Sequence, residues 1–386
     1  MNWKFRAAAL VAIVGAAGAI ATPATAAEPP IRFGLVVPLS GPVAVFGVPQ
    51  KQAVEIMTDE VNAKGGILGR KLEIVTYDDQ AQAEKTANFV TRLIENDDVS
   101  VILGPSTTGT TMAAIPIAQD AGVPLMALSG GLQITEPPKK WVFRFSLSDR
   151  EACQYILDYV KAHDGTNVAL ISDTGAYGKS MRGNCLAEAA KRGITIVADE
   201  SYGPNDADMT AQLTKIKNTA GVQAIVNCGF AQGPAIVVRN YRSLGITAPL
   251  YESQAVASKD FITLAGPAAE GIFLALAPEN LAEILPASDP QAAAIKAFQA
   301  ALEARFHTPV SGFAGNVYDG FWMAVKAIEA AGSTDKAKVR DAIEATHDFV
   351  GMNGIFNMSP TDHNGINASS LRMVVVKNGT WAFAPK

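Results

Sequence analysis

The chain has 386 residues, of which 48% are hydrophobic and 18% are charged, and its 32 basic and 37 acidic side chains give a net charge of −5. This length exceeds what one hydrophobic core usually supports, so we expect two lobes. The acidic balance argues against nucleic acid or an anionic membrane as a partner.

The first 27 residues have the three parts of a secretory signal peptide. Lys4 and Arg6 provide the positive start, residues 7–21 form an apolar run, and residues 24–26 give the small-residue cleavage pattern. The apolar run is too short for a transmembrane anchor. The sequence therefore predicts export to the periplasm. The cleavage point has no cysteine to which a lipid anchor would be attached.

From residue 31 onward, short β-branched runs alternate with helical stretches. Strands are expected at 31–39, 71–78, 99–105 and 124–130, and helices at 48–64, 83–96 and 110–122. The strand segments are almost continuously apolar, which is typical of a parallel sheet that is covered on both faces. This part of the chain is therefore expected to form a doubly wound α/β lobe.

The alternation restarts after the turn-rich segment 135–149. Helices are expected at 150–163, 178–193, 208–220 and 233–245, and strands at 167–173, 194–202, 224–229 and 249–254. This second series predicts a second α/β lobe. Beyond residue 278 the pattern is helical again up to residue 346, and strands follow at 369–383. Late helices without strands between them indicate that the chain returns to complete the first lobe.

Three cysteines occur in a chain that is expected to reach an oxidising compartment, so at most one disulfide pair forms. Cys153 and Cys185 fall on successive predicted helices and are the candidate pair, although sequence alone does not decide whether they are bridged. The third cysteine is Cys228. The four histidines are scattered and no Cys-x-x-Cys occurs, so no metal site is expected.

Catalytic and nucleotide-binding motifs fail on inspection. Gly178-Lys179-Ser180 is similar to the end of a phosphate-binding loop, but Asp173 stands where the first glycine belongs. Segment 104–109 has one residue too many for a nucleophile elbow. Because no nucleophile with an evident base emerges, neither an enzyme nor a cofactor is predicted, and a periplasmic hydrolase is the least favoured alternative.

Six segments spaced along the mature chain carry a family resemblance: GLVVPLSGPVAVFG, NAKGGILGRKLEIVTYDDQ, VILGPSTTGTTMAAIPIAQDAGVPLMALSG, FRFSLSDREACQYI, AAEGIF and YDGFWMAVKAIEAAG. Together they resemble the periplasmic branched-chain amino acid binding proteins. The resemblance implies a type I periplasmic binding protein fold, with two doubly wound α/β lobes joined by three crossings and the ligand in the cleft between them. On that pattern the first lobe takes 28–146 and 278–360, and the second takes 147–277 and 361–386.

The function that this resemblance implies is solute binding for an ABC importer. Such a protein closes over one small molecule, and its partners are the permease and ATPase subunits in the inner membrane. We expect a periplasmic monomer without a cofactor. A ligand sensor that presents the same closed form to a receptor kinase is the alternative from another class, and the sequence does not separate the two.

Polar residues follow two strands of the first predicted lobe. Thr107 and Thr108 lie between a strand and a helix, where hydroxyls and free backbone N–H groups meet the positive end of the helix dipole. This arrangement predicts a carboxylate site. Ser129, Gly130 and Gly131 lie on the next loop, where the resembling family holds the carboxylate and ammonium of its ligand. Helix capping by Thr108 and a tight turn would also explain each loop alone.

Across the cleft, the second lobe is expected to contribute Tyr177, Phe230 and Gln254 from three successive loops. Phe46, on the loop after the first strand, is expected to face them. Glu252 is the open alternative to Gln254 as the residue that faces the cleft. Core packing is the alternative explanation of the two phenylalanines.

These residues depart from the resembling family in a consistent way. Phe46 and Phe230 stand where that family tends to have tyrosine, Gln254 stands where it has an acidic residue, and Gly131 stands where threonine is common. A buried ammonium group without an acceptor costs several kcal/mol. The sequence therefore predicts a carboxylate ligand with an apolar or aromatic body, and a branched-chain amino acid or other amino acid or amide remains the alternative.

Overall fold

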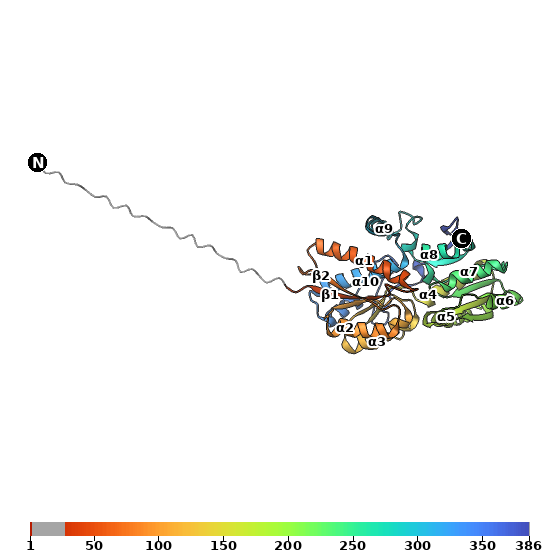
Figure 1. The fold of residues 1–386 in the computed structure, drawn as a ribbon, viewed down its shortest axis with the longest axis horizontal. Helices are drawn as coiled ribbons and strands as arrows, with labels where there is room; N and C mark the ends of the chain where they lie inside the picture. The colour runs from red at the N-terminus through yellow and green to blue at the C-terminus, as the bar shows by residue number, and fades with distance from the viewer. Residues whose placement is uncertain (2–27, 386) are drawn as a thin grey trace.

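The computed structural model describes residues 1 and 28–385. The predicted signal peptide thus lies, apart from its first residue, outside the described residues. Two lobes lie side by side along the long axis of the molecule, each built on its own β-sheet (Figure 1). We call them the first lobe, which contains β1 to β5, and the second lobe, which contains β6 to β10 with β13 and β14.

The first sheet has the strand order β2-β1-β3-β4-β5, and all its pairs are parallel. Its strands are β1 (Ile31–Val37), β2 (Leu72–Asp78), β3 (Val101–Leu103), β4 (Leu125–Ala127) and β5 (Val142–Arg144). Strands β3, β4 and β5 are buried along their whole length. The sequences of β3 and β4 are wholly apolar, as expected when helices cover both faces of a sheet, and β5 ends with the buried Arg144.

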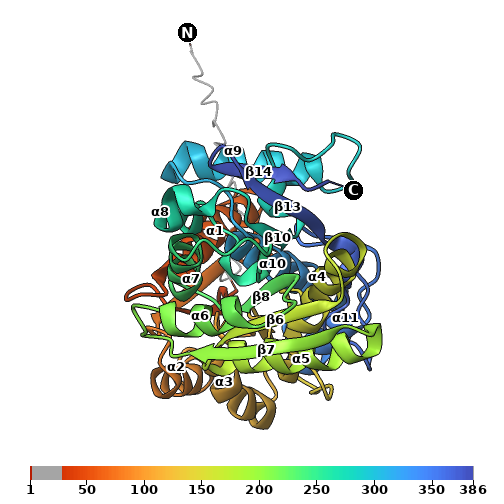
Figure 2. The same cartoon turned by 90° about the vertical axis from the view of Figure 1, so that its right-hand side faces the viewer.

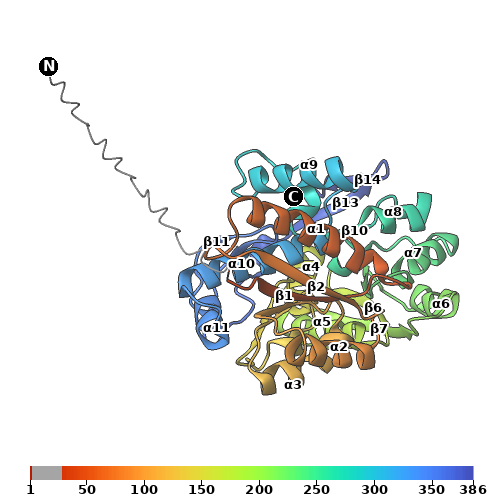
Figure 3. The ribbon, with the colours of Figure 1, turned by 60° about the vertical axis from the view of Figure 1, so that its left-hand side comes forward.

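Helices sandwich the first sheet. Helices α1 (Ala44–Ala63) and α10 (Gly312–Ala331) pack together on one face, and α2 (Ala83–Glu95) and α3 (Thr108–Ala121) pack together on the other (Figure 3). Helix α9 (Ala292–Phe306) packs against α1, and α11 (Lys336–Glu344) packs against α10. The late helical block therefore does return to the first sheet.

The second sheet has the order β14-β13-β10-β9-β8-β6-β7, with β13 and β14 antiparallel to their neighbours. Its strands are β6 (Asn167–Asp173), β7 (Thr195–Tyr202), β8 (Ala224–Cys228), β9 (Leu250–Glu252), β10 (Phe273–Leu276), β13 (Arg372–Lys377) and β14 (Thr380–Phe383). In Figure 2, α6, α7 and α8 lie along one side of this sheet and α4 and α5 along the other. These helices span Asp149–His163 (α4), Ala176–Arg192 (α5), Thr210–Asn218 (α6), Gly233–Ser243 (α7) and Lys259–Ala265 (α8).

Short elements complete the chain. They are the ribbon of β11 (Phe349–Val350) with β12 (Ile355–Phe356), and the 3-10 turns η1 (Leu132–Ile134), η2 (Gln254–Val256), η3 (Gly266–Ala269), η4 (Pro278–Leu281) and η5 (Ala368–Ser370). The chain changes lobe after β5, after β10 and between β12 and β13. This architecture confirms the predicted fold class of two doubly wound lobes. The residue boundaries 147, 278 and 361 between the lobes stay a proposal.

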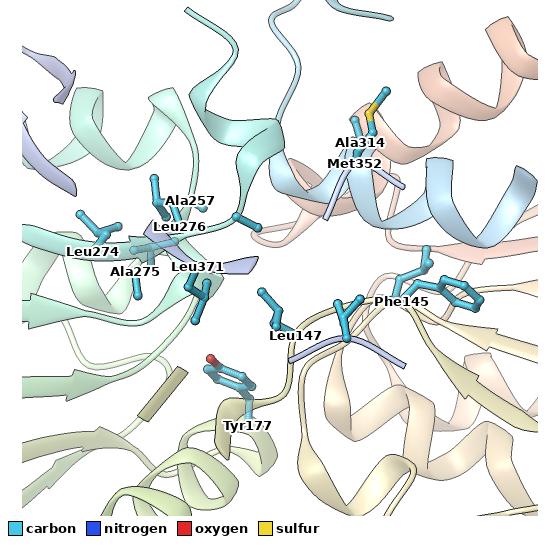
Figure 4. Close-up of a cluster of buried hydrophobic side chains, with 14 of the residues drawn as sticks. Phe145, Leu147, Tyr177, Ala257, Leu274, Ala275, Leu276, Ala314, Met352 and Leu371 are labelled. Atoms are coloured by element: carbon cyan, nitrogen blue, oxygen red, sulfur yellow. The ribbon is translucent and has the colours of Figure 1, made fainter. Parts of the chain in front are cut away.

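The hydrophobic interior is continuous where the chain crosses between the lobes. Figure 4 shows Leu147 on the first crossing segment, with Phe145 on one side and Leu371 and Tyr177 on the other. All four side chains are buried. The crossing segments are therefore held by packing rather than left as free linkers.

A disulfide joins α4 to α5 in the second lobe. It connects Cys153 and Cys185, whose Cα atoms are 5.1 Å apart. Cys228 on β8 is buried as a free thiol, with its Sγ 3.9 Å from the Sγ of Cys185. Burial raises the pKa of the Cys228 thiol to about 12, which keeps it protonated and unreactive.

Two helices begin earlier than predicted, and this moves two site residues. Helix α1 begins at Ala44 and α5 at Ala176, so Phe46 and Tyr177 lie in first helical turns and not in loops as predicted. Neither helix has a side-chain N-cap. The start signal that Ser, Thr, Asp or Asn normally gives is therefore missing from both sequences. Among the described residues, no helix is long and apolar enough to cross a membrane.

Candidate functional site

A pocket of about 680 Å³ lies between the lobes, at the carboxyl ends of strands from both sheets. It is lined by Phe46, Ser106, Thr107, Thr108, Leu128, Ser129, Gly130, Ser146, Leu147, Tyr177, Phe230, Gln254, Ala255, Ala257, Ala277, Glu279, Asn280, Gly312, Phe313, Asn316 and Asn353. The lining combines hydroxyls and amides with aromatic rings, as expected for a small amphipathic ligand.

Eight of the nine residues predicted from sequence line this single pocket, and Gly131 does not. Gly131 lies directly behind Thr108, because a Cβ atom on Gly131 would come within 2.4 Å of the Thr108 Cγ2. Its carbonyl accepts a hydrogen bond of 3.0 Å from the buried guanidinium of Arg144. Gly131 thus supports Thr108 from behind, and its predicted contact with the ligand stays a prediction.

The start of α3 forms the polar end of the pocket. Thr107 is the N-cap, and its hydroxyl lies 2.8 Å from that of Thr110. Thr108 begins the helix and is 1% exposed, and its Oγ1 has no hydrogen-bond partner in the protein. The hydroxyl of Ser129, on the loop after β4, lies 2.8 Å from that of Thr111. Hydroxyls and first-turn N–H groups therefore converge here, as a carboxylate site requires.

No His, Cys, Lys or Arg stands among the described residues that line the pocket. An anion at the α3 end would therefore be bound by neutral donors and the helix dipole, not by an ion pair. In the described part of the chain, no group of three or more His, Cys, Asp or Glu side chains is placed to hold a metal ion.

Four aromatic rings form the apolar wall and join the two lobes. Phe46 and Phe313, from α1 and α10 of the first lobe, have ring centroids 4.2 Å apart. Phe230, on the loop after β8, lies 6.1 Å from Phe46 across the cleft and 6.0 Å from Tyr177. Burial raises the pKa of the Tyr177 hydroxyl well above its usual value, so the ring stays uncharged. The wall suits an apolar or aromatic ligand body.

Gln254, and not Glu252, faces the pocket. Gln254 begins η2, and the preceding Ser253 is fixed by donating a 2.6 Å hydrogen bond to the Gly229 carbonyl. Both polar atoms of the Gln254 side chain are buried without a partner. Glu252 is fully buried on β9, where Asn227 Nδ2 donates to its carboxylate at 2.9 Å. Burial raises the pKa of Glu252 to about 8.

Sequence reasoning missed the side of the pocket formed by η4, α10 and the loop after β11. Glu279 and Asn280 lie on η4, Phe313 and Asn316 in the first turns of α10, and Asn353 in the loop between β11 and β12. Glu279 is 2% exposed, its Oε1 accepts a 2.9 Å hydrogen bond from Asn280 Nδ2, and its Oε2 has no partner. Burial, reinforced by the nearby Asp319, raises the pKa of Glu279 well above its usual range.

Asp319 positions one of these missed residues. Its carboxylate accepts hydrogen bonds from the backbone and side-chain nitrogens of Asn353, at 2.9 and 2.8 Å. Burial raises the pKa of Asp319 to about 7. Asp319 itself does not line the pocket, so its part is to hold Asn353 against α10.

A signal for Glu279 and Asn280 was present in the sequence. Ligand residues in α/β sheets follow the carboxyl ends of strands, and both residues closely follow the apolar segment 272–277, which contains β10. Phe313, Asn316 and Asn353 give no such signal, because their approach to the cleft depends on how α10 packs on the first sheet.

Comparison with known proteins matches this chain to one family and finds similar proteins whose names describe amino acid binding. Residues 30–380 match the model of the family described as periplasmic binding protein. A Leu/Ile/Val-binding protein homolog of Brucella melitensis is 28% identical over 327 residues, which cover 84% of this chain and 85% of that protein. The leucine-, isoleucine-, valine-, threonine- and alanine-binding protein of Pseudomonas aeruginosa is 28% identical, with 82% of each chain covered.

Solved structures of similar proteins share the architecture. An extracellular ligand-binding receptor of Rhodopseudomonas palustris superposes with a TM-score of 0.85 at 27% identity, covering 92% of this chain and all of that one. The branched-chain amino acid transporter substrate-binding protein LivJ of Streptococcus pneumoniae, solved with isoleucine, superposes with a TM-score of 0.80 at 27% identity, covering 91% and 97%.

Proposed function

Because the chain belongs to the periplasmic binding protein family, we propose that it is the solute-binding component of an ABC importer. The family resemblance carried by the six sequence segments is confirmed by the match over residues 30–380. In this proposal the protein works in the periplasm, binds a small carboxylic acid with an apolar body between its lobes, and delivers it to a permease and ATPase. A receptor sensor would use the same closed form but a different partner.

The observation that carries the proposal is a set of buried polar atoms without partners around one pocket. They are Thr108 Oγ1, Gln254 Nε2 and Oε1, and Glu279 Oε2. Buried polar groups are otherwise almost always hydrogen-bonded, because an unsatisfied group costs about 1–3 kcal/mol. Three such side chains from both lobes, all in one pocket, are most simply explained by a ligand that supplies the missing hydrogen bonds.

The arrangement favours one orientation of the ligand. The carboxylate would lie at the start of α3, against Thr107 and Thr108, where hydroxyls and the helix dipole stabilise negative charge. The apolar body would lie against Phe46, Phe230 and Phe313. Gln254 would contribute a hydrogen bond from the second lobe and so link ligand binding to closure.

Two ligand classes fit, and a specific observation favours each. An aromatic acid, which the sequence predicts, is favoured by the aromatic rings and the neutral Gln254. An aliphatic amino acid is favoured by Glu279, because this acidic residue lines the pocket and would accept a hydrogen bond from an ammonium group. The relatives named above bind branched-chain amino acids according to their names.

A thermal-shift screen tests the proposed function. The mature protein is unfolded and refolded to remove bound ligand, then melted with amino acids, amides, and aromatic and aliphatic carboxylates. A ligand at 100 times its dissociation constant stabilises the fold by about 2.7 kcal/mol, which is a shift of several degrees. Stabilisation by acids of one class identifies that class, and no shift with any acid overturns the proposal.

Thr108→Ala tests the carboxylate anchor in the same assay. Loss of a charge-assisted hydrogen bond should weaken binding of the identified acid by about 1–3 kcal/mol, measured by calorimetry. Thr91→Ala is the control, because Thr91 lies on α2, bonds only the Ala87 carbonyl and does not line the pocket. Unchanged affinity in Thr108→Ala would remove Thr108 from the site.

A further inference from the structure

Glu279 is a buried carboxyl group on the pocket wall that neither the sequence motifs nor the carboxylate anchor accounts for. We propose that Glu279 is a specificity-determining residue, which binds a hydrogen-bond donor group, hydroxyl or ammonium, on the body of the carboxylate ligand. This inference rests on the proposed function and specifies the substrate class further. The ligand is then an acid with a second, donating polar group.

The hydrogen bonds around Glu279 leave one oxygen for the ligand. Asn280 Nδ2 donates to Glu279 Oε1 at 2.9 Å, and Asn280 Oδ1 accepts from the Gly312 backbone N–H at 2.9 Å. This pair fixes the carboxyl group against the start of α10. The Glu279 Oε2 has no partner, although the side chain is 2% exposed and lines the pocket.

Helix α10 leaves room for this side chain through two glycines. A Cβ atom on Gly315 would lie 2.7 Å from Glu279 Cγ, and one on Gly312 would lie 3.1 Å from Glu279 Oε1. Neither glycine has a positive φ. The backbone conformation therefore does not require glycine at these two positions. The space that the Glu279 side chain occupies does require it, so α10 is shaped to accommodate this carboxyl group.

Capping of α10 does not explain Glu279. Ser311 is the N-cap, with its side chain accepting from the Ala314 N–H, and Asn280 satisfies the Gly312 N–H. Glu279 accepts no hydrogen bond from α10, and no ion pair involves it in the described part of the chain. Because Glu279 does not cap the helix, capping does not account for a carboxyl group buried at the pocket surface.

The surroundings predict how each kind of donor would bind. Asp319 is the titratable group close to Glu279, and burial together with its charge raises the pKa of Glu279 well above the usual range. This raised pKa favours the protonated carboxyl group, which would share a neutral hydrogen bond with a ligand hydroxyl. An ammonium group would instead stabilise the carboxylate and release a proton.

The test uses two ligand pairs that differ only in the donor. They are leucine with 4-methylpentanoate, and 4-hydroxybenzoate with benzoate. Calorimetry on stripped wild-type protein should give at least about tenfold tighter binding of the donor-bearing member of one pair, because a site built to hydrogen-bond a group rejects the analogue without it. In Glu279→Leu this ratio should fall close to one. Glu283→Gln, an exposed residue paired with Lys259, is the matched control and should keep the wild-type ratio.

Glu279→Gln is the second variant. Glutamine keeps the shape of the side chain, so this variant should fold even if Glu279→Leu does not. Glu279→Gln should retain a preference for 4-hydroxybenzoate over benzoate, because an amide can also bind a hydroxyl. It should lose a preference for leucine over 4-methylpentanoate, because an amide does not balance the charge of an ammonium group. Titrations in two buffers of different ionisation enthalpy distinguish the two donors further. An ammonium group that ionises Glu279 should release protons on binding, whereas the hydroxyl of 4-hydroxybenzoate should not.

The outcomes separate the two proposals. Equal binding of both members of each pair by the wild type, or an unchanged preference in Glu279→Leu, would overturn the role of Glu279 and leave the carboxylate-binding function in place. Binding of none of the four acids would overturn the proposed function and this inference with it.

Discussion

Glu252 and Gln254 lie two residues apart, yet one side chain is buried in the second lobe and the other faces the pocket. Glu252 ends β9, and its carboxylate is bound by Asn227 on the neighbouring strand β8. Gln254 follows the strand, where η2 turns its side chain into the pocket. The end of the strand therefore decides which of the two residues can contribute to specificity.

Glu252 should make the stability of the protein depend on pH. Burial raises its pKa from the usual 4.5 to about 8, so between these values the folded chain binds a proton that the unfolded chain has lost. Stability from this group is therefore full at low pH and falls as pH rises towards 8. We expect Glu252→Gln to match the wild type near pH 4 and to exceed it by at least about 1 kcal/mol at pH 8, because each pKa unit corresponds to about 1.4 kcal/mol.

Urea unfolding at several pH values measures this difference directly. Asp149 and Asp319, whose pKa values burial raises to about 6 and 7, contribute a slope of the same sign in both proteins, so only the difference between variant and wild type is interpreted. Glu283→Gln controls for loss of a surface carboxylate. A constant difference from pH 4 to pH 8 would show that Glu252 titrates normally.

At the scale of elements, the order of strands and helices could be predicted because short, almost continuously apolar runs alternate with longer helical stretches. Their junctions were less predictable, since α1 and α5 begin without a capping side chain and so carry Phe46 and Tyr177 within their first turns. The η4 and α10 side of the pocket was missed for another reason. Gly315 is adapted to Glu279, which lies 36 residues earlier, and such tertiary pairing has no local sequence signal.

The disulfide between α4 and α5 gives a prediction for these two helices. Cys153 and Cys185 are separated by 32 residues, and closing a loop of this length should stabilise the fold by roughly 2–4 kcal/mol, mainly by constraining the unfolded chain. We expect the double variant Cys153→Ala/Cys185→Ala to lose this stability in denaturant unfolding. Its ligand affinity should be unchanged, because neither cysteine lines the pocket.

The double variant is preferable to either single one, because Cys228 lies 3.9 Å from Cys185 and would offer a new partner. Cys228→Ala, with the bridge intact, serves as the control for changes in core packing. Equal unfolding midpoints for the double variant and the wild type would contradict a stabilising bridge.

For the whole molecule, the lobes contact each other across the cleft through interactions that are individually weak. The Ser180 hydroxyl on α5 donates a 2.7 Å hydrogen bond to Gln133 on η1, and Phe230 lies against Phe46 across the cleft. A hydrogen bond of this kind contributes only about 1 kcal/mol net. A carboxylate held at α3 and by Gln254 would add contacts from both lobes at once, so closure and binding should be coupled.

Small-angle X-ray scattering tests this coupling. A compact chain of the mature length has an expected radius of gyration of about 21 Å, and we expect the stripped protein to exceed its ligand-bound value because the lobes separate about the three crossings. At a ligand concentration that saturates only the wild type, the Thr108→Ala variant should keep the larger radius of gyration. This control would show that the decrease in radius is caused by ligand binding and not by the added solute. An identical radius with and without saturating ligand would mean that the lobes stay closed, and the transporter would then have no change of shape by which to recognise the loaded protein.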